Sequence, residues 1–185
     1  MNRFHLAWVL AAACFGAGTA GAAVTVVGSS NARLCYEAAE RDSTRDRRQL
    51  EHCDMALQET MLSLADIVAT HVNRGILRSR VGDVSGALAD FDQATSLDPN
   101  EPEAYLNKGL VLTIKANDAR TALPLFGMAL ERKTKRPELA YYGRAAAYEE
   151  LGNLRSAYAD YSKAVAAAPK WQQARAELAR FQVRR

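Results

Sequence analysis

The feature that most constrains the fold of this chain is a pattern of small and aromatic residues that recurs three times. In each copy an alanine is followed four positions later by an aromatic residue and three positions after that by a second alanine. The copies are Ala87–Phe91–Ala94, Ala122–Phe126–Ala129 and Ala157–Tyr161–Ala164. A small residue stands 12 or 13 positions before each copy, at Gly75, Gly109 and Ala145. Such self-similarity predicts a stack of repeated units.

Spacings of three and four residues place the repeated residues on one face of a helix. Small residues at Gly75, Gly109 and Ala145 would face small residues at Ala87, Ala122 and Ala157, which lets two helices approach closely. Phe91, Phe126 and Tyr161 would fill the space between neighbouring pairs. Gly82 and Gly152 favour tight turns, and Pro99 and Pro169 end the second helices. We expect first helices at 64–80, 101–115 and 138–151, and second helices at 84–97, 119–132 and 154–167.

At this point the chain resembles the tetratricopeptide repeat family, whose period is 34 residues of helix–turn–helix. Gly75 and Gly109 are 34 residues apart, and Gly109 and Ala145 are 36 apart. The resemblance implies an all-α, right-handed solenoid. It departs from the family pattern at Ala145, which replaces a glycine, and in the middle repeat, which lacks the turn glycine and the final proline. The predicted repeats are 64–101, 102–137 with a two-residue insertion, and 138–170, followed by a capping helix and tail at 171–185.

Residues 30–62 are predicted to form a fourth, degenerate helix pair. Between its two helices, arginines alternate with aspartates in a small basic cluster. Its arginines are Arg41, Arg45, Arg47 and Arg48. A charged run of this kind usually indicates a solvated connection, and a site for phosphate or an acidic partner is the other interpretation.

Residues 1–23 are predicted to be a signal segment that is removed on export. One positive charge at Arg3 precedes an apolar stretch from Phe4 to Phe15. Both Ala20-x-Ala22 and Gly21-x-Ala23 place small residues where a signal peptidase reads them. We therefore expect an exported chain, periplasmic or secreted, that begins at Val24.

Two other uses of this segment stay open. No Asp, Glu, Lys or Arg interrupts residues 4–27, and about 20 apolar residues are enough to span a bilayer, so the segment could remain as an anchor. Cys14 could instead carry a lipid, although Leu10 lies four positions before it rather than the usual three. Either alternative would tether the same repeats to a membrane.

Removal of the segment would leave two cysteines, Cys35 and Cys53, which are 18 residues apart. In an oxidising compartment a disulfide between them is the expected state. Closing a loop of this size stabilises a protein by about 3 kcal/mol in the loop-entropy account. Buried free thiols are the alternative, because cysteine also packs as a small apolar residue.

Composition and motifs favour neither catalysis nor a cofactor. The chain has 24 Lys and Arg against 21 Asp and Glu, a net charge of +3, with no strongly basic block, which argues against nucleic acid as the partner. No G-x-S-x-G, G-x-x-x-x-G-K-[ST] or H-E-x-x-H motif occurs. His52 and Cys53 are adjacent and would point ~100° apart on a helix, so we expect no metal. His71 is predicted to be a packing residue.

The resemblance implies a groove on the concave face, which in this family is lined by the first helices and binds an extended peptide or a segment of a partner. Carried over position by position, the groove residues are Val72, Asn73, Ile76 and Arg80; Leu106, Asn107, Leu110 and Ile114; and Tyr142, Gly143, Ala146 and Glu149. Asn73 and Asn107 match a frequent peptide-contacting asparagine. A side-chain amide can pair with any peptide backbone, because it offers both donors and an acceptor. The apolar positions could equally be core between repeats.

The family members that clamp a terminal carboxylate use cations in the groove. Here Arg74 and Lys108 are expected to face neighbouring helices instead. The sequence therefore predicts an exported, non-enzymatic scaffold or adaptor that binds a protein or peptide segment, without nucleic acid or a small-molecule substrate. The alternatives are a self-associating structural protein of the cell envelope and, least favoured, an enzyme with an unrecognised site.

Overall fold

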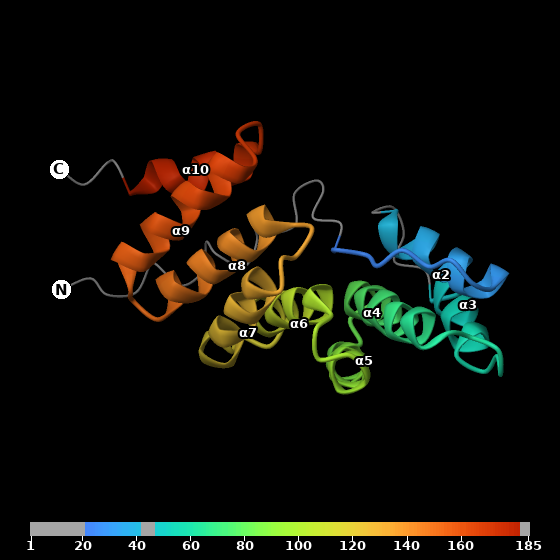
Figure 1. Cartoon of the computed structure of the whole chain (residues 1–185). Helices are drawn as coiled ribbons and strands as arrows, with labels where there is room; N and C mark the ends of the chain where they lie inside the picture. Colours follow the sequence, from blue (N-terminus) through green and yellow to red (C-terminus); the bar gives the residue numbers. More distant parts are fainter. Residues whose placement is uncertain (1–20, 42–46, 182–185) are drawn as a thin grey trace.

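The computed structural model describes residues 21–41 and 47–181, and within these ranges every regular element is an α-helix. The helices are α2 (Ser30–Glu40), α3 (Gln49–Ala56), α4 (Leu64–Arg80), α5 (Val84–Leu97), α6 (Pro102–Ile114), α7 (Ala119–Glu131), α8 (Pro137–Glu150), α9 (Leu154–Ala167) and α10 (Gln172–Arg180). Successive helices pair and stack into an arc, with α2 and α3 at one end and α9 and α10 at the other (Figure 1). The all-α solenoid is confirmed, and the predicted ends of the helices between 64 and 167 are each within one residue of the observed ends.

Local chemistry explains where the repeat helices begin and end. The side chains of Ser63, Asp83, Asp118 and Asn153 each accept a hydrogen bond from a backbone N–H in the first turn of the helix that follows, which satisfies a group that the helix leaves unpaired. Gly82 and Gly152 take positive φ angles of 86° and 77° in the turns. In the middle repeat Asn117 takes a positive φ angle of 57°, so an asparagine replaces the missing turn glycine.

Aromatic rings from the second helices fill the space beside the small residues of the first. A Cβ added to Gly75 would lie 2.6 Å from the ring of Phe91, and one added to Gly109 would lie 2.9 Å from the ring of Phe126. Phe126 also touches the next repeat, since a Cβ at Gly143 would come within 2.5 Å of the same ring. The nearest neighbours of these glycines are therefore aromatic rings, where the sequence predicted alanine. Ala87, Ala122, Ala145 and Ala157 are all fully buried.

The C-terminal repeat is closed by α10. Tyr161 packs with Tyr142 at a ring-centre distance of 5.4 Å, and the ring of Trp171 lies 4.7 Å from that of Tyr142. Ala174, Leu178 and Phe181 complete this cluster. The predicted apolar stripe of the capping helix is confirmed, and Arg175 on its other face is exposed.

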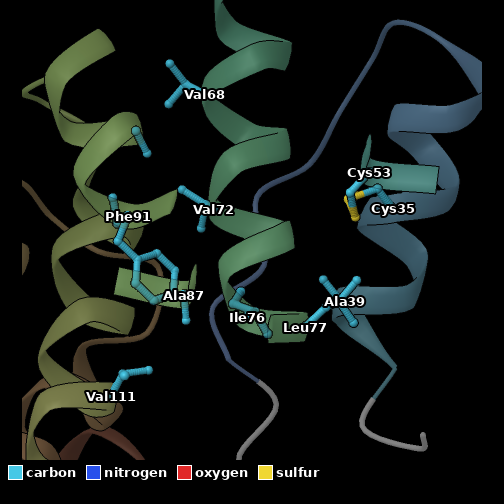
Figure 2. Close-up of a cluster of buried hydrophobic side chains, with 12 residues drawn as sticks. Cys35, Ala39, Cys53, Val68, Val72, Ile76, Leu77, Ala87, Phe91 and Val111 are labelled. Carbon is cyan, nitrogen blue, oxygen red and sulfur yellow. A yellow bond between two sulfur atoms is a disulfide. The ribbon is translucent and has the colours of Figure 1, made fainter. Parts of the chain in front are cut away.

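The N-terminal helix pair is joined by a disulfide between Cys35 of α2 and Cys53 of α3, whose Cα atoms are 4.9 Å apart. Both residues are fully buried and share a core cluster with Val72, Ile76 and Phe91 (Figure 2). Part of the predicted basic cluster lies outside the described residues, namely Asp42, Arg45 and Asp46. Residues 1–20 of the predicted signal segment also lie outside them. Among the described helices, none has both the length and the apolar character needed to cross a membrane.

Candidate peptide-binding groove

The inner side of the arc holds an extended segment of the chain itself, residues 21–28, here called the N-terminal segment. It runs beside α6 and α4 and then enters α2, on the opposite side of α4 from α5 (Figure 1). It has no helix or strand structure. Its main chain is held by side chains of the first helices, and these contacts define the groove.

Asn73 holds Val24 by both of its main-chain groups. The backbone N–H of Val24 donates to Oδ1 of Asn73 at 2.9 Å, and Nδ2 of Asn73 donates to the carbonyl oxygen of Val24 at 2.8 Å. Asn73 lies in the middle of α4 and is fully buried. A buried amide must find partners or lose the free energy of hydration, so this pair stabilises the docked position of the segment.

Two further side chains hold the segment on either side of Asn73. Nδ2 of Asn107 donates to the carbonyl oxygen of Ala22 at 3.1 Å and to that of Glu103 at 2.8 Å. At the other end, the backbone N–H of Val27 donates to Oδ1 of Asp66 at 3.0 Å. Asp66 is oriented by the hydroxyl of Ser63, which donates to its Oδ2 at 2.8 Å. The hydrogen bonds that Asn73, Asn107 and Asp66 make with the segment go to its main-chain atoms, so these bonds place no demand on the side chains of the segment.

The side chains of the segment alternate between the repeats and solvent, as in an extended chain. Ala22 and Val26 are 4% and 7% exposed, whereas Val27 is 92% exposed. Val24 packs against two core clusters. Gly28 and Gly21 bracket the segment, since a Cβ at Gly28 would come within 2.5 Å of Asp66 and one at Gly21 within 2.9 Å of Asn107. The groove therefore admits small and branched apolar residues at every second position.

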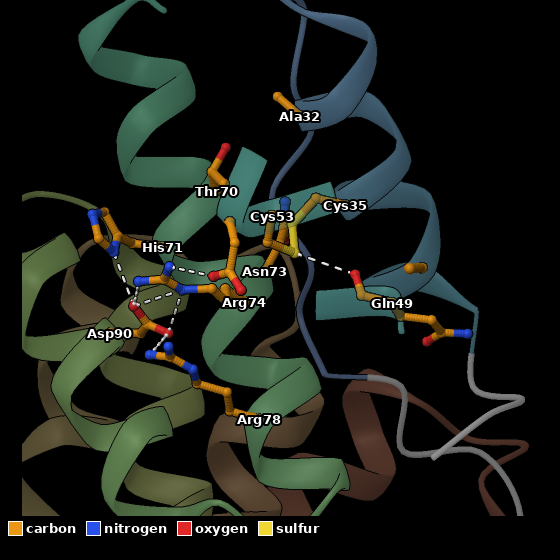
Figure 3. Close-up of a disulfide and its surroundings, with 12 residues drawn as sticks. Ala32, Cys35, Gln49, Cys53, Thr70, His71, Asn73, Arg74, Arg78 and Asp90 are labelled. Carbon is orange, nitrogen blue, oxygen red and sulfur yellow. Dashed lines mark hydrogen bonds and ion pairs between the residues drawn. A yellow bond between two sulfur atoms is a disulfide. The ribbon is translucent and has the colours of Figure 1, made fainter. Parts of the chain in front are cut away.

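Helix α4, which supplies Asn73 and Asp66, is fixed from behind by a charged cluster. Asp90 of α5 is 2% exposed and accepts hydrogen bonds from Arg74 at 2.7 Å and from Arg78 at 2.7 Å, and it lies 3.0 Å from Nδ1 of His71 (Figure 3). Burial raises the pKa of Asp90, but the hydrogen bonds and positive charges around it prevail and leave the pKa below its ordinary value. The same contact recurs as Arg144 with Asp160, at 2.6 Å.

A comparison with protein families matches residues 139–170 to a tetratricopeptide repeat. This match covers α8, which begins at Pro137, and α9, which ends at Ala167. The helix pairs α4–α5 and α6–α7 repeat the same arrangement of small, aromatic and capping residues. Residues 139–170 form a tetratricopeptide repeat.

A search of solved structures supports the all-α solenoid fold. A chain titled "MamA RS-1 ArsTM double mutant" aligns with a TM-score of 0.65 at 24% sequence identity, over 84% of this chain and 85% of that one. At this identity the likeness is one of fold. No curated protein matches the sequence.

Three of the residues that the family pattern assigns to the groove lie along the N-terminal segment. They are Asn73, Asn107 and Ile76, whose side chain would be 3.1 Å from a Cβ at Gly21. Others belong to the core. Val72 points toward Phe91 (Figure 2), Leu106 is fully buried in the cluster around Phe126, and Tyr142 packs against Tyr161 and Trp171.

Two charged residues of the predicted set contact neighbouring helices. Arg80 donates to the carbonyl oxygens of Ala39 at 2.7 Å and Arg41 at 2.9 Å, at the C-terminal end of α2, where a cation is favoured. Glu149 accepts hydrogen bonds from Tyr161 and from Arg180 of α10. Leu110 packs against the cluster around Phe126, near Gly143, and Ile114 and Ala146 are half-buried.

Arg74 and Lys108 face neighbouring helices, as predicted, because Arg74 pairs with Asp90 and Lys108 with Asp92. The family pattern did not include Asp66, which lies at the start of α4 where its carboxylate also suits the helix terminus. His71, predicted to be a packing residue, is half-buried and contacts Asp90. Within 21–41 and 47–181, no group of three or more His, Cys, Asp or Glu side chains is placed to hold a metal ion.

Proposed function

We propose that this chain is an exported scaffold that binds an extended segment of a protein partner along the inner face of its repeats. The observation that carries the proposal is the pair of hydrogen bonds between Asn73 and Val24, at 2.9 and 2.8 Å. They join a buried side chain of the repeats to the main chain of an extended peptide. Tetratricopeptide repeats generally mediate contacts between proteins, and this contact has the chemistry that such binding requires.

Recognition through main-chain atoms suits a binding module rather than an enzyme. The inner face presents Asn73, Asn107 and Asp66 as hydrogen-bonding groups, and each of them contacts the main chain of the N-terminal segment. Main-chain hydrogen bonds provide affinity in such sites, and pockets for alternate side chains provide selectivity. The ligand that fits is therefore an extended, uncharged segment of a protein.

Export is the second part of the proposal. It is supported by the charge, apolar stretch and small residues of 1–23 and by the disulfide between Cys35 and Cys53, since disulfides persist in oxidising compartments. Mass spectrometry of the chain from its own cells tests it. A chain that begins near Val24 is the expected result, an intact N-terminus would contradict removal, and a lipid on Cys14 would favour a membrane-tethered form.

Affinity capture from the cell envelope tests the binding proposal. The full-length gene carries a C-terminal tag, and the matched variants are Asn73→Ala with Asn107→Ala in the groove and Gln93→Ala, an exposed residue of α5, as the control. We expect a partner that the wild type and the control capture equally and that the groove variant loses by tenfold or more. A partner captured equally by all three would place binding elsewhere, and capture of the chain alone would favour the self-associating alternative.

A further inference from the structure

The groove is already occupied in this structure, and its occupant belongs to the same chain. We propose that the N-terminal segment acts as a tethered ligand, of which residues 24–28 remain when residues 1–23 are removed on export: it fills the groove when no partner is present, and a partner segment of the same chemistry binds by displacing it. This inference rests on the proposed function, because it assumes that the groove binds peptide segments of other proteins.

The contacts of the N-terminal segment are those of a ligand rather than those of a repeat. Four hydrogen bonds of 2.8 to 3.1 Å join main-chain groups of the segment to side chains of α4 or α6, and three of the four are made by Val24 and Val27. It forms no helix and pairs with no strand. An irregular segment held by so few contacts belongs to the least stable part of a fold and opens more readily than packed helices.

The occupant belongs to the same molecule because its connection is too short to reach another. Val27 contacts Asp66, and Ser29 already caps α2, so a single residue, Gly28, lies between the groove and the helix. Helix α2 packs against α4 and is bonded to α3 by the disulfide. The segment could reach a second copy only if α2 also left its place.

The docked segment defines the chemistry of the partner. Positions equivalent to Ala22, Val24 and Val26 face the repeats, so a competing segment needs small or β-branched apolar side chains at every second position. Asp66 accepts a main-chain N–H at one end, which disfavours an acidic residue there because two like charges would meet. The partner that fits is an extended, uncharged segment rich in Ala, Val, Thr and Gly.

Tethering has a measurable consequence. A short flexible connection gives an attached ligand an effective concentration in the millimolar range. A free peptide of the same sequence must compete with it and will bind weakly to the intact chain. If the attached segment is released while the groove stays intact, the same peptide will bind more tightly.

The probe is a fluorescent peptide with the sequence of residues 21–28, and binding is followed by fluorescence anisotropy on purified, oxidised, full-length chain whose mass is confirmed. Val24→Pro removes the N–H that donates to Asn73, and Ala22→Glu places a charged side chain in a buried site. Val27→Ala, which changes only an exposed side chain of the same segment, is the control. We expect both release variants to bind the probe at least tenfold more tightly than the wild type and the control. Adding Asn73→Ala and Asn107→Ala should abolish that gain.

Three results would overturn the inference. One is equal affinity of the wild type and both release variants for the probe, and another is absence of binding to all of them. The third is loss of helical structure in both release variants, measured by circular dichroism, which would make the segment an inseparable part of the fold. None of these affects capture of a partner by the wild-type chain, so failure of this inference and failure of the proposed function are distinguishable.

Discussion

Asn73 and Val24 lie 49 residues apart in the sequence and are joined by two hydrogen bonds, one accepted and one donated by the same amide. This pairing is the most direct link between the repeats and the N-terminal segment. Through this pairing, the inner face of α4 holds the main chain of an extended segment of the same molecule.

The first prediction concerns this pair. Asn73→Ala should free the Val24 amide, since its acceptor is lost, and hydrogen exchange at Val24 should become about tenfold faster, the equivalent of one hydrogen bond of about 1.4 kcal/mol. Two-dimensional NMR of the full chain measures the rate. Asn100→Ala, at an exposed position, should leave it unchanged. Equal exchange rates in wild type and Asn73→Ala would contradict the docked position of Val24.

A second prediction concerns the contact between repeats at Phe126. Gly143→Ala should lower the free energy of unfolding by about 1–3 kcal/mol, because the added methyl would lie 2.5 Å from the Phe126 ring. Gly127→Ala provides a matched control, since nothing lies within 4 Å of its added Cβ; helix propensity should there raise stability by up to about 1 kcal/mol. Chemical denaturation measures both. An unchanged midpoint for Gly143→Ala would contradict the packing of α7 against α8.

The third prediction concerns the disulfide. Changing Cys35 and Cys53 together to alanine should lower the free energy of unfolding by about 3 kcal/mol, because the unfolded chain regains the freedom of an 18-residue loop. Reductant should lower the melting temperature of the wild type and leave that of the double variant unaltered. Two free thiols in the native, exported protein would contradict the bond.

A fourth prediction is the pH dependence that follows from Asp90. Its pKa is lowered in the folded chain, so the folded state binds this proton less readily than the unfolded state does. The stability that Asp90 contributes is therefore fully present above the unfolded pKa of about 3.9 and is lost as the pH falls through the lower folded pKa.

Asp90→Asn should remove the loss of stability that protonation of Asp90 causes at low pH. At neutral pH it should also lower the free energy of unfolding by about 2–3 kcal/mol, because Arg74 and Arg78 lose a buried partner. Asp92→Asn is the control: its exposed pair with Lys108 should be worth less than about 1 kcal/mol. Unfolding in urea between pH 7 and pH 2.5 measures both variants. Parallel pH profiles for the wild type and Asp90→Asn would exclude Asp90 as the source.

Some of the predicted groove residues contact the N-terminal segment, and others contact neighbouring helices. The difference depends on tertiary structure that the sequence pattern does not show. Asn73 and Arg80 were both assigned by family position. Asn73 meets the N-terminal segment, whereas Arg80 reaches the carbonyl oxygens that end α2, about 40 residues away in the sequence. A family pattern places both on the inner side of a first helix. Only the position of α2, which is specific to this chain, decides which one remains available to a ligand.

The repeat architecture could be predicted from the sequence because it rests on local interactions. Helical spacing, the capping residues Ser63 and Asp83, and the aromatic residue four positions after each small one act within a single helix pair. The docking of Ala22–Val27 was decided by tertiary structure alone. Its contacts join residues 49 and 85 positions apart, and they bind main-chain atoms, which every residue possesses. The side chains of the segment therefore give no sequence signal for these contacts. The folded arc of helices places Asn73, Asn107 and Asp66 along one side, and this arrangement determines where the segment lies.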